Sequence, residues 1–167
     1  MTQAPLDAAL REPAHRVSRR APAYWRTVAA AQAALVIAAV AGSYAAPVDR
    51  PWWSHVLAVL AGVVVLVPVV VMPGVRWRIH RWEVTPEAVF TRSGWLSREQ
   101  RIAPLSRVQT VDTRQGALMR PFGLMSVTVT TASAAGPIVV ECLDAEVALR
   151  LVADLTARTA AVEGDAT

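Results

Sequence analysis

Two long apolar stretches occupy the first half of the chain. Residues 27–46 carry no charged side chain, and neither do residues 52–72. As helices rising 1.5 Å per residue, both stretches match a hydrocarbon core about 30 Å thick. A soluble helix is rarely apolar on every face for this long, and lipid requires the backbone to bond internally. We therefore predict a hairpin of two transmembrane helices over 24–73, because residues 47–51 are too few to hold a domain.

One alternative concerns the first helix. Ser43, Tyr44 and Ala45 resemble a signal-peptidase site, which would make this helix a cleaved signal. The segment before the helix is long for the basic start of a signal peptide, and the apolar run exceeds the usual length. These two features favour a retained membrane helix.

The second half consists of short segments with strand character, broken by turn residues. Val127 and Val129 alternate with serine and threonine, as in a half-buried antiparallel strand. The apolar residues of the first segment change from one side of the expected strand to the other. A bulge or bend near His80 would explain this change. The expected strands lie near 77–84, 87–92, 96–102, 106–114, 125–131 and 137–143.

An amphipathic helix is predicted after the last strand, from Asp144 to about Ala160. Its apolar positions recur every three or four residues, with charged residues on the opposite side. A strongly bent antiparallel sheet or open barrel, closed by this helix, fits the order of elements over 74–160. Residues 161–167 are expected to form a disordered tail.

The charge distribution predicts an orientation. The chain has a net charge of +4 and no lysine, and its mean hydropathy of +0.35 reflects the apolar stretch 27–72. Cytoplasmic flanks of membrane helices are enriched in basic residues. Both termini, including a basic and flexible tail over 1–23, are therefore expected in the cytoplasm beneath the cell membrane. The arginines that flank the helices are Arg16, Arg19, Arg20 and Arg26 before the first, and Arg76, Arg78 and Arg81 after the second.

Aromatic residues mark the expected membrane interfaces. Tyr24 and Trp25 precede the first helix, and Trp52 and Trp53 begin the second. Such amphipathic rings concentrate at the level of the lipid headgroups. No sharp repeat of small residues predicts a dimer face in the helices, so the oligomeric state stays open.

Four stretches of the second half carry sequence motifs: Trp77–Thr85, Arg92–Trp95, Ile102–Asp112, and Phe122–Gly123–Leu124 before Val127–Thr131. Together these motifs resemble the YdbS-like bacterial PH domain proteins. The resemblance covers roughly residues 20–160 and implies an α+β membrane protein, in which a transmembrane hairpin precedes a domain with a pleckstrin-homology-like (PH-like) fold. A shared fold does not specify a ligand.

The sequence shows no set of residues typical of an enzyme. His15, His55 and His80 have no metal-ligand spacing with the single cysteine, Cys142, or with a carboxylate pair. The chain has no phosphate-binding glycine loop and no basic stripe for nucleic acid. We therefore predict no catalytic residues, metal or cofactor, and a buried strand position for Cys142. A transporter is also disfavoured, because its pathway would need several ionisable groups in the helices.

Four arginines of the second half are candidate contact residues: Arg98, Arg101, Arg107 and Arg114. They could form surface ion pairs, or they could bind lipid headgroups or an acidic segment of a partner. Phe122 lies in an apolar loop, 119–124, that either covers the open end of the barrel or forms an exposed patch.

The leading functional hypothesis is a non-enzymatic module, anchored in the membrane, that binds another protein or organises a membrane complex. The resemblance implies a larger membrane protein with several PH domains as the partner, in envelope stress or peptide resistance. The runner-up is a direct sensor of anionic lipid headgroups. It predicts binding to anionic vesicles that weakens as salt screens the arginines.

Overall fold

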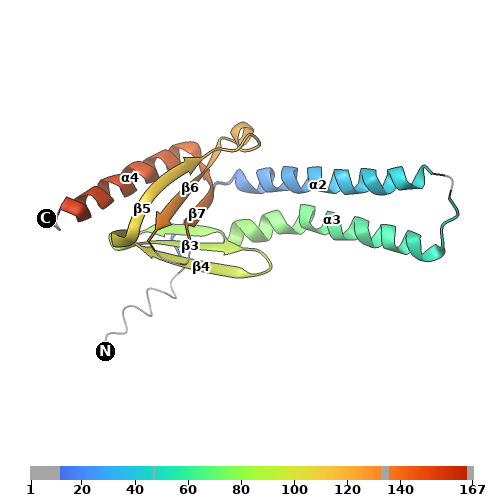
Figure 1. Cartoon of the computed structure of the whole chain (residues 1–167), viewed down its shortest axis with the longest axis horizontal. Helices are drawn as coiled ribbons and strands as arrows, with labels where there is room; N and C mark the ends of the chain where they lie inside the picture. Colours follow the sequence, from blue (N-terminus) through green and yellow to red (C-terminus); the bar gives the residue numbers. More distant parts are fainter. Residues whose placement is uncertain (1–11, 47, 133–135, 165–167) are drawn as a thin grey trace, which may run out of the picture. The chain divides into compact units, whose positions relative to one another are not determined.

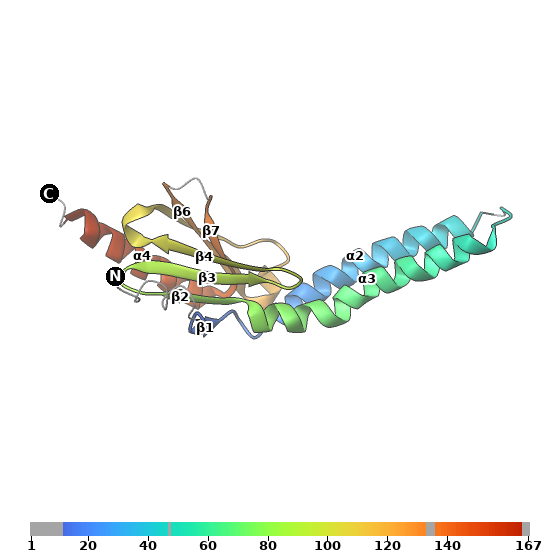
Figure 2. The same ribbon diagram turned by 90° about the horizontal axis from the view of Figure 1, so that it is seen from below.

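The computed structural model describes residues 12–46, 48–132 and 136–164, and the chain divides into two compact units. One unit is a helical hairpin over Pro22–Val75. The other combines the segment before Pro22 with the chain from Arg76 onward, and it contains all the strands. Figures 1 and 2 show the two units from perpendicular directions.

The hairpin consists of α2 (Ala21–Tyr44) and α3 (Trp52–Ile79). Both are long and apolar enough to cross a membrane, and only 11% and 6% of their most apolar windows are buried. Helices of a soluble core would be mostly buried, so the exposed apolar surface of this pair fits lipid as its solvent. The helices run side by side in Figures 1 and 2.

Polar contacts organise the connection between the two helices. The Tyr44 hydroxyl lies 3.1 Å from His55 Nδ1, which joins the end of α2 to the start of α3. The Arg50 guanidinium stacks on the Tyr44 ring at 4.6 Å and donates to the carbonyl oxygens of Ser43 and Ala46. These bonds satisfy carbonyl groups that a helix end leaves without partners.

The second helix is longer than predicted, and the expected strand 77–84 is wrong in its first half. Helix α3 continues to Ile79, and β2 (Arg81–Val84) begins one residue after His80. The amide of His80 donates to the carbonyl of Arg76 at 2.8 Å, so the helical bonding persists to this residue. The bend expected near His80 is therefore the junction between a helix and a strand.

The strands form two antiparallel sheets that do not close into a barrel. The first sheet has the order β1-β2-β3-β4 and the second has the order β5-β6-β7. This arrangement, followed by α4 (Ala145–Gly164), confirms the predicted α+β fold class. The remaining bounds are β1 His15–Arg16, β3 Ala88–Gly94, β4 Arg98–Pro104, η1 Leu105–Arg107, β5 Val108–Arg114, η2 Arg120–Phe122, β6 Leu124–Thr131 and β7 Ile138–Asp144.

Helix α4 covers the second sheet and completes one hydrophobic core (Figure 1). Leu151 and Leu155 of α4 are buried with Val127 and Val129 of β6. The alternation predicted around Val127 is confirmed, because the valines are buried while the intervening polar residues are half-buried. Helix α4 continues beyond the predicted end at Ala160, and residues 165–167 lie outside the described residues.

The segment before α2 differs from the flexible tail that the sequence predicts. Its described part, residues 12–20, pairs with the first sheet through β1, where His15 faces Trp82 of β2. The Glu12 carboxylate accepts a hydrogen bond from Arg92 at 2.5 Å and lies 3.5 Å from Arg81. The Arg92 hydrogen bond, followed by the charge of Arg81, lowers the pKa of Glu12. We call residues 12–20 the strap.

Candidate functional site

The strap is fixed to the β domain through Ser18. Its amide donates to the carbonyl of Cys142 at 3.0 Å, and its hydroxyl donates to Asp144 Oδ1 at 2.8 Å. The indole Nε1 of Trp77, in the last turn of α3, donates to the Ser18 carbonyl at 3.1 Å. Ser18 is 6% exposed, so these bonds are largely shielded from water. The strap, β7 and the end of α3 are thus held together at one residue.

The backbone around Cys142 adapts to receive the strap. The β6–β7 pairing shifts register between Met125 and Val127, and Cys142 adopts φ 56°. A residue other than glycine rarely adopts this left-handed conformation, which costs about 1–2 kcal/mol. A β-bulge of this kind redirects backbone groups, and here the Cys142 carbonyl accepts the Ser18 amide. As predicted, the Cys142 thiol is buried on a strand.

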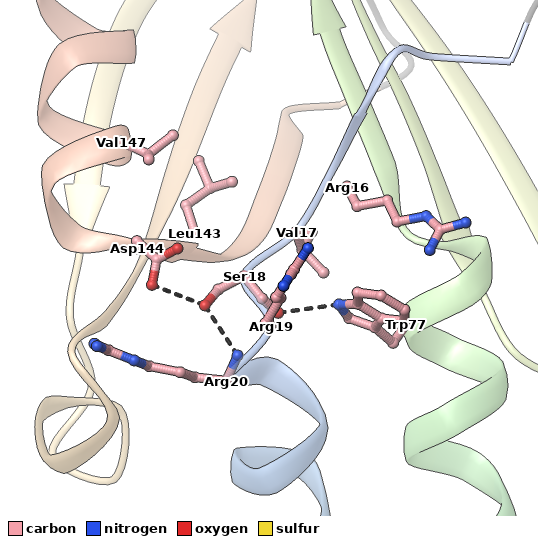
Figure 3. A pocket seen from close by; sticks show the side chains of 9 residues that line it. All are labelled: Arg16, Val17, Ser18, Arg19, Arg20, Trp77, Leu143, Asp144 and Val147. Carbon is pink, nitrogen blue, oxygen red and sulfur yellow. Dashed lines mark hydrogen bonds between the residues drawn. The ribbon is translucent and has the colours of Figure 1, made fainter.

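A pocket of about 600 Å³ lies between the strap, the end of α3 and the start of α4. Figure 3 shows Arg20 extending toward Asp144, while Arg16 extends to the Trp77 side. The Arg16 guanidinium lies 4.8 Å from the centroid of a Trp77 ring. Arg20 Nη1 reaches the Phe122 carbonyl at 3.5 Å. Arg19, which also lines the pocket, bonds to no residue that the structure describes. We call this the strap pocket.

Gly123 leaves the space that Arg20 occupies. A Cβ at this position would lie 3.0 Å from Arg20 Nη1, and the glycine has φ 64°. Its carbonyl accepts the amide of Ala145, the first residue of α4. A second cavity, of about 420 Å³, shares Arg20, Asp144 and Val147 with the strap pocket and extends along the first turn of α4. The two cavities are therefore neighbours on the β domain.

Another polar pocket, of about 480 Å³, is lined by His80 and by residues of β3 and β4 in the first sheet and of β7 in the second. Arg76 Nη2 lies 2.6 Å from Glu141 Oε2, while Arg76 Nε donates to His80 Nε2 at 3.3 Å. His80 Nδ1 lies 3.0 Å from the Arg76 carbonyl, so it carries the proton and donates to that oxygen. Burial, and then the positive charge of Arg76, lower the pKa of His80 to about 4. The imidazole is therefore neutral near pH 7.

We expect this histidine to make stability depend on pH. Unfolding would return the pKa from about 4 to the ordinary 6.5, so the unfolded chain binds the proton more tightly. Stability is then complete above pH 6.5 and falls as the pH drops toward 4, by about 2 kcal/mol at pH 5. The measurement is the free energy of unfolding of the full chain in detergent, between pH 7 and pH 5. Glu12 does not interfere in this range, because its lowered pKa makes it titrate at lower pH.

The matched variant for this test is His80→Gln, which cannot take up a proton. Its stability should be nearly constant between pH 7 and pH 5. An equal pH dependence in the variant and in the natural chain would show that another group is responsible.

Replacing Ser18 with alanine should release the strap. The change removes the hydroxyl that donates to Asp144 and that accepts the Arg20 amide at 3.1 Å. The loss is about 1–2 kcal/mol, equivalent to roughly tenfold faster hydrogen exchange in the strap amides. Ser106→Ala is the control, because Ser106 is exposed. Equal exchange in the two variants would show that the Ser18 hydroxyl does not hold the strap.

The structure does not gather the four candidate arginines of the second half. Arg98 and Arg101 lie on β4, three residues apart, so their side chains leave opposite faces of the strand. Arg101 pairs with Glu99 at 2.6 Å and donates to the Pro137 carbonyl at 3.0 Å. Arg107 and Arg114 lie at opposite ends of the segment that includes β5, about 23 Å apart in an extended strand. Phe122, from η2, is half-buried.

The residues expected at the membrane interface differ in exposure. Trp52 and Trp53 are 76% and 53% exposed, whereas Trp25 is buried. Arg26 and Arg78 are exposed. Arg76 and Arg81 have protein partners instead, Arg76 with Glu141 and Arg81 with Glu12.

Within the described residues there is no group of three or more histidine, cysteine, aspartate or glutamate residues that could hold a metal ion. Of the residues that line the strap pocket, Arg16, Arg19 and Arg20 were assigned by sequence only to membrane topology. One signal could have indicated more, because Arg16, Arg19 and Arg20 lie within five residues and surround a serine.

Comparison with known proteins identifies the family. The family model described as "Bacterial PH domain" matches residues 27–159. The chain is 36% identical over 84 residues to the transmembrane protein YdbS of Bacillus subtilis (strain 168), a match covering 50% of this chain and 53% of that protein. The chain thus spans about half the length of this curated relative. No solved structure matches it. The two apolar helices and the open antiparallel sheets agree with these matches, and the chain belongs to the bacterial PH domain family as a YdbS-like membrane protein.

Proposed function

We propose that the protein is a non-enzymatic module that holds a PH-like domain at the cytoplasmic face of the cell membrane, where the domain binds another membrane protein. The observation that supports this most is the attachment of the domain to both helices without a linker. The strap ends at Arg20 and α2 begins at Ala21, while only His80 separates α3 from β2. Confinement of this kind raises the concentration of the domain for neighbours in the same membrane.

The arginine distribution supports the cytoplasmic orientation. Arg16, Arg19 and Arg20 precede α2, and Arg76 and Arg78 occupy the last turn of α3. The only charged residues in the connection between the helices are Asp49 and Arg50. Positive charges stay on the cytoplasmic side of a membrane, so both ends of the hairpin are assigned there.

The edge of the first sheet is the surface that we assign to a protein partner. Strand β4 is the last strand of that sheet, and five of its seven residues are exposed. Edge strands present backbone amides and carbonyls that can pair with a strand of another protein. The exposed Arg98 on this edge favours an acidic partner segment.

Site-specific photocrosslinking in native membranes tests the proposal. A crosslinker at Gln100 of β4 should give an adduct of defined mass, and one at Arg150, an exposed position of α4, should not. The adduct should weaken in the Arg98→Glu chain, because the altered charge repels an acidic segment. The absence of an adduct at Gln100, or equal adducts at both positions, would contradict a partner at this edge.

A further inference from the structure

We propose that the strap pocket binds a phosphate-bearing anion, carried either by a lipid headgroup or by a soluble phosphate compound. This site is separate from the β4 edge, and it does not depend on the proposed protein partner. It rests on three arginines that line one cavity and on the bonds that hold their backbone in place.

The charges of the pocket favour an anion. Arg16, Arg19 and Arg20 line it, and Asp144 is the one acidic residue among the described residues that line it. The Asp144 carboxylate already accepts the Ser18 hydroxyl at 2.8 Å. Guanidinium groups bind phosphate oxygens through paired hydrogen bonds, and Arg19 has no bond to any described residue that would compete. The volume of about 600 Å³ is in the range of small-molecule sites.

The pocket is preorganised by its surroundings. Ser18 bonds to Asp144, Trp77 and Arg20, as Figure 3 shows, and its amide bonds to Cys142. The backbone that carries the three arginines is therefore fixed before a ligand arrives. A fixed backbone reduces the entropy lost on binding. Simple determination of topology would require only the charges and not this anchored geometry.

Two pocket residues, Trp77 and Arg20, lie within a few residues of the proposed membrane spans along the chain. Helix α3 has 28 residues and is about 42 Å long, which exceeds a hydrocarbon core by about 12 Å. If residues 52–72 fill that core, Trp77 lies outside it. The strap enters the same layer from the other connection, because Arg20 immediately precedes α2. Lipid phosphates are concentrated in this layer.

Binding to defined lipids tests the inference. The full chain, purified in a neutral detergent, is titrated with phosphatidylglycerol, phosphatidylcholine and an anionic lipid that lacks phosphate, and retained lipid is measured by native mass spectrometry. In a separate arm without added lipid, inorganic phosphate is titrated while thermal unfolding is followed. We expect phosphatidylglycerol to be retained at least about tenfold more than either other lipid.

Two double variants distinguish the pocket from general charge. Arg19→Lys with Arg20→Lys keeps the charge and the membrane topology but loses the paired donor geometry, and it should reduce retention about tenfold. Arg107→Gln with Arg114→Gln removes two exposed positive charges elsewhere and should leave retention unchanged. The first variant should also unfold at the natural temperature, which separates loss of binding from loss of structure.

Each outcome decides the inference. Preferential retention of phosphatidylglycerol that is lost only in the Arg19/Arg20 variant identifies a lipid headgroup. Stabilisation by inorganic phosphate, lost in that variant and without any lipid preference, identifies a soluble phosphate compound. Equal retention of both anionic lipids, equal loss in the two double variants, or no response to either ligand overturns the site. A negative result here leaves the crosslinking result at β4 unaffected.

Discussion

Introducing two arginines in the middle of α3, by Leu60→Arg together with Val64→Arg, is expected to prevent stable membrane insertion of the hairpin. The natural residues are 52% and 69% exposed and lie one helical turn apart. Each arginine at the centre of a membrane helix costs about 2.5–3.5 kcal/mol on an insertion scale, so the pair costs about 5–7 kcal/mol. The measurement is the fraction of the chain that stays in membranes after alkaline extraction, which should fall several-fold.

The matched control for this prediction is Leu60→Ala with Val64→Ala. Alanine shortens both side chains without adding charge, and the helix keeps enough apolar residues to insert. Membrane retention of the arginine variant at the level of the alanine variant would show that lipid does not surround this part of α3.

The second large effect is expected in the core of the β domain. Leu155 of α4 is 0% exposed and packs with the residues of the main core. Leu155→Ala removes apolar contacts and leaves a cavity, which costs about 2–5 kcal/mol. Unfolding of the full chain in detergent, followed by a signal from the β domain, should show a correspondingly lower midpoint.

Leu149→Ala is a close control, since it makes the same substitution on the same helix. Leu149 is 57% exposed, so its replacement should change the stability by less than about 0.5 kcal/mol. Equal destabilisation by the two substitutions would contradict the packing of α4 on the sheets.

The elements predicted correctly from sequence are those encoded by local periodicity. The run of uncharged residues in α3 and the alternation in β6 each depend on near neighbours in the chain. The apolar face of α4 is similarly local, and Leu151 and Leu155 on it are buried. Such patterns predict that an element exists more reliably than they predict its ends, which explains the extension of α3 to Ile79.

The strap could not be predicted because its partners are distant in sequence. The Ser18 hydroxyl bonds to Asp144, 126 residues later, and Trp77 bonds to Ser18 from 59 residues away. A two-residue strand such as His15–Arg16 has no periodicity that could reveal it. A short basic segment beside a membrane helix satisfies the positive-inside rule whether it is flexible or folded. The charge of the strap therefore does not predict that the strap is ordered.

Strand geometry also explains why the four candidate arginines of the second half do not form one site. Arg98, Arg101, Arg107 and Arg114 are close in sequence, but strand geometry separates them onto different faces and ends. Arg16, Arg19 and Arg20 line one cavity, and Ser18 fixes the strap that carries them through its bond to Asp144. Whether charges share a surface is decided by tertiary contacts and not by spacing.

We propose that α2 and α3 span the membrane and leave the β domain in the cytoplasm. The most direct test of this proposal uses cysteine labelling, since Cys142 is the only cysteine and is 1% exposed. Asp49→Cys, in the connection between the helices, should react with a membrane-impermeant maleimide in intact cells. Glu87→Cys, in the turn before β3, should react only after the membrane is permeabilised. Labelling of Glu87→Cys in intact cells, or protection of Asp49→Cys there, would contradict the account.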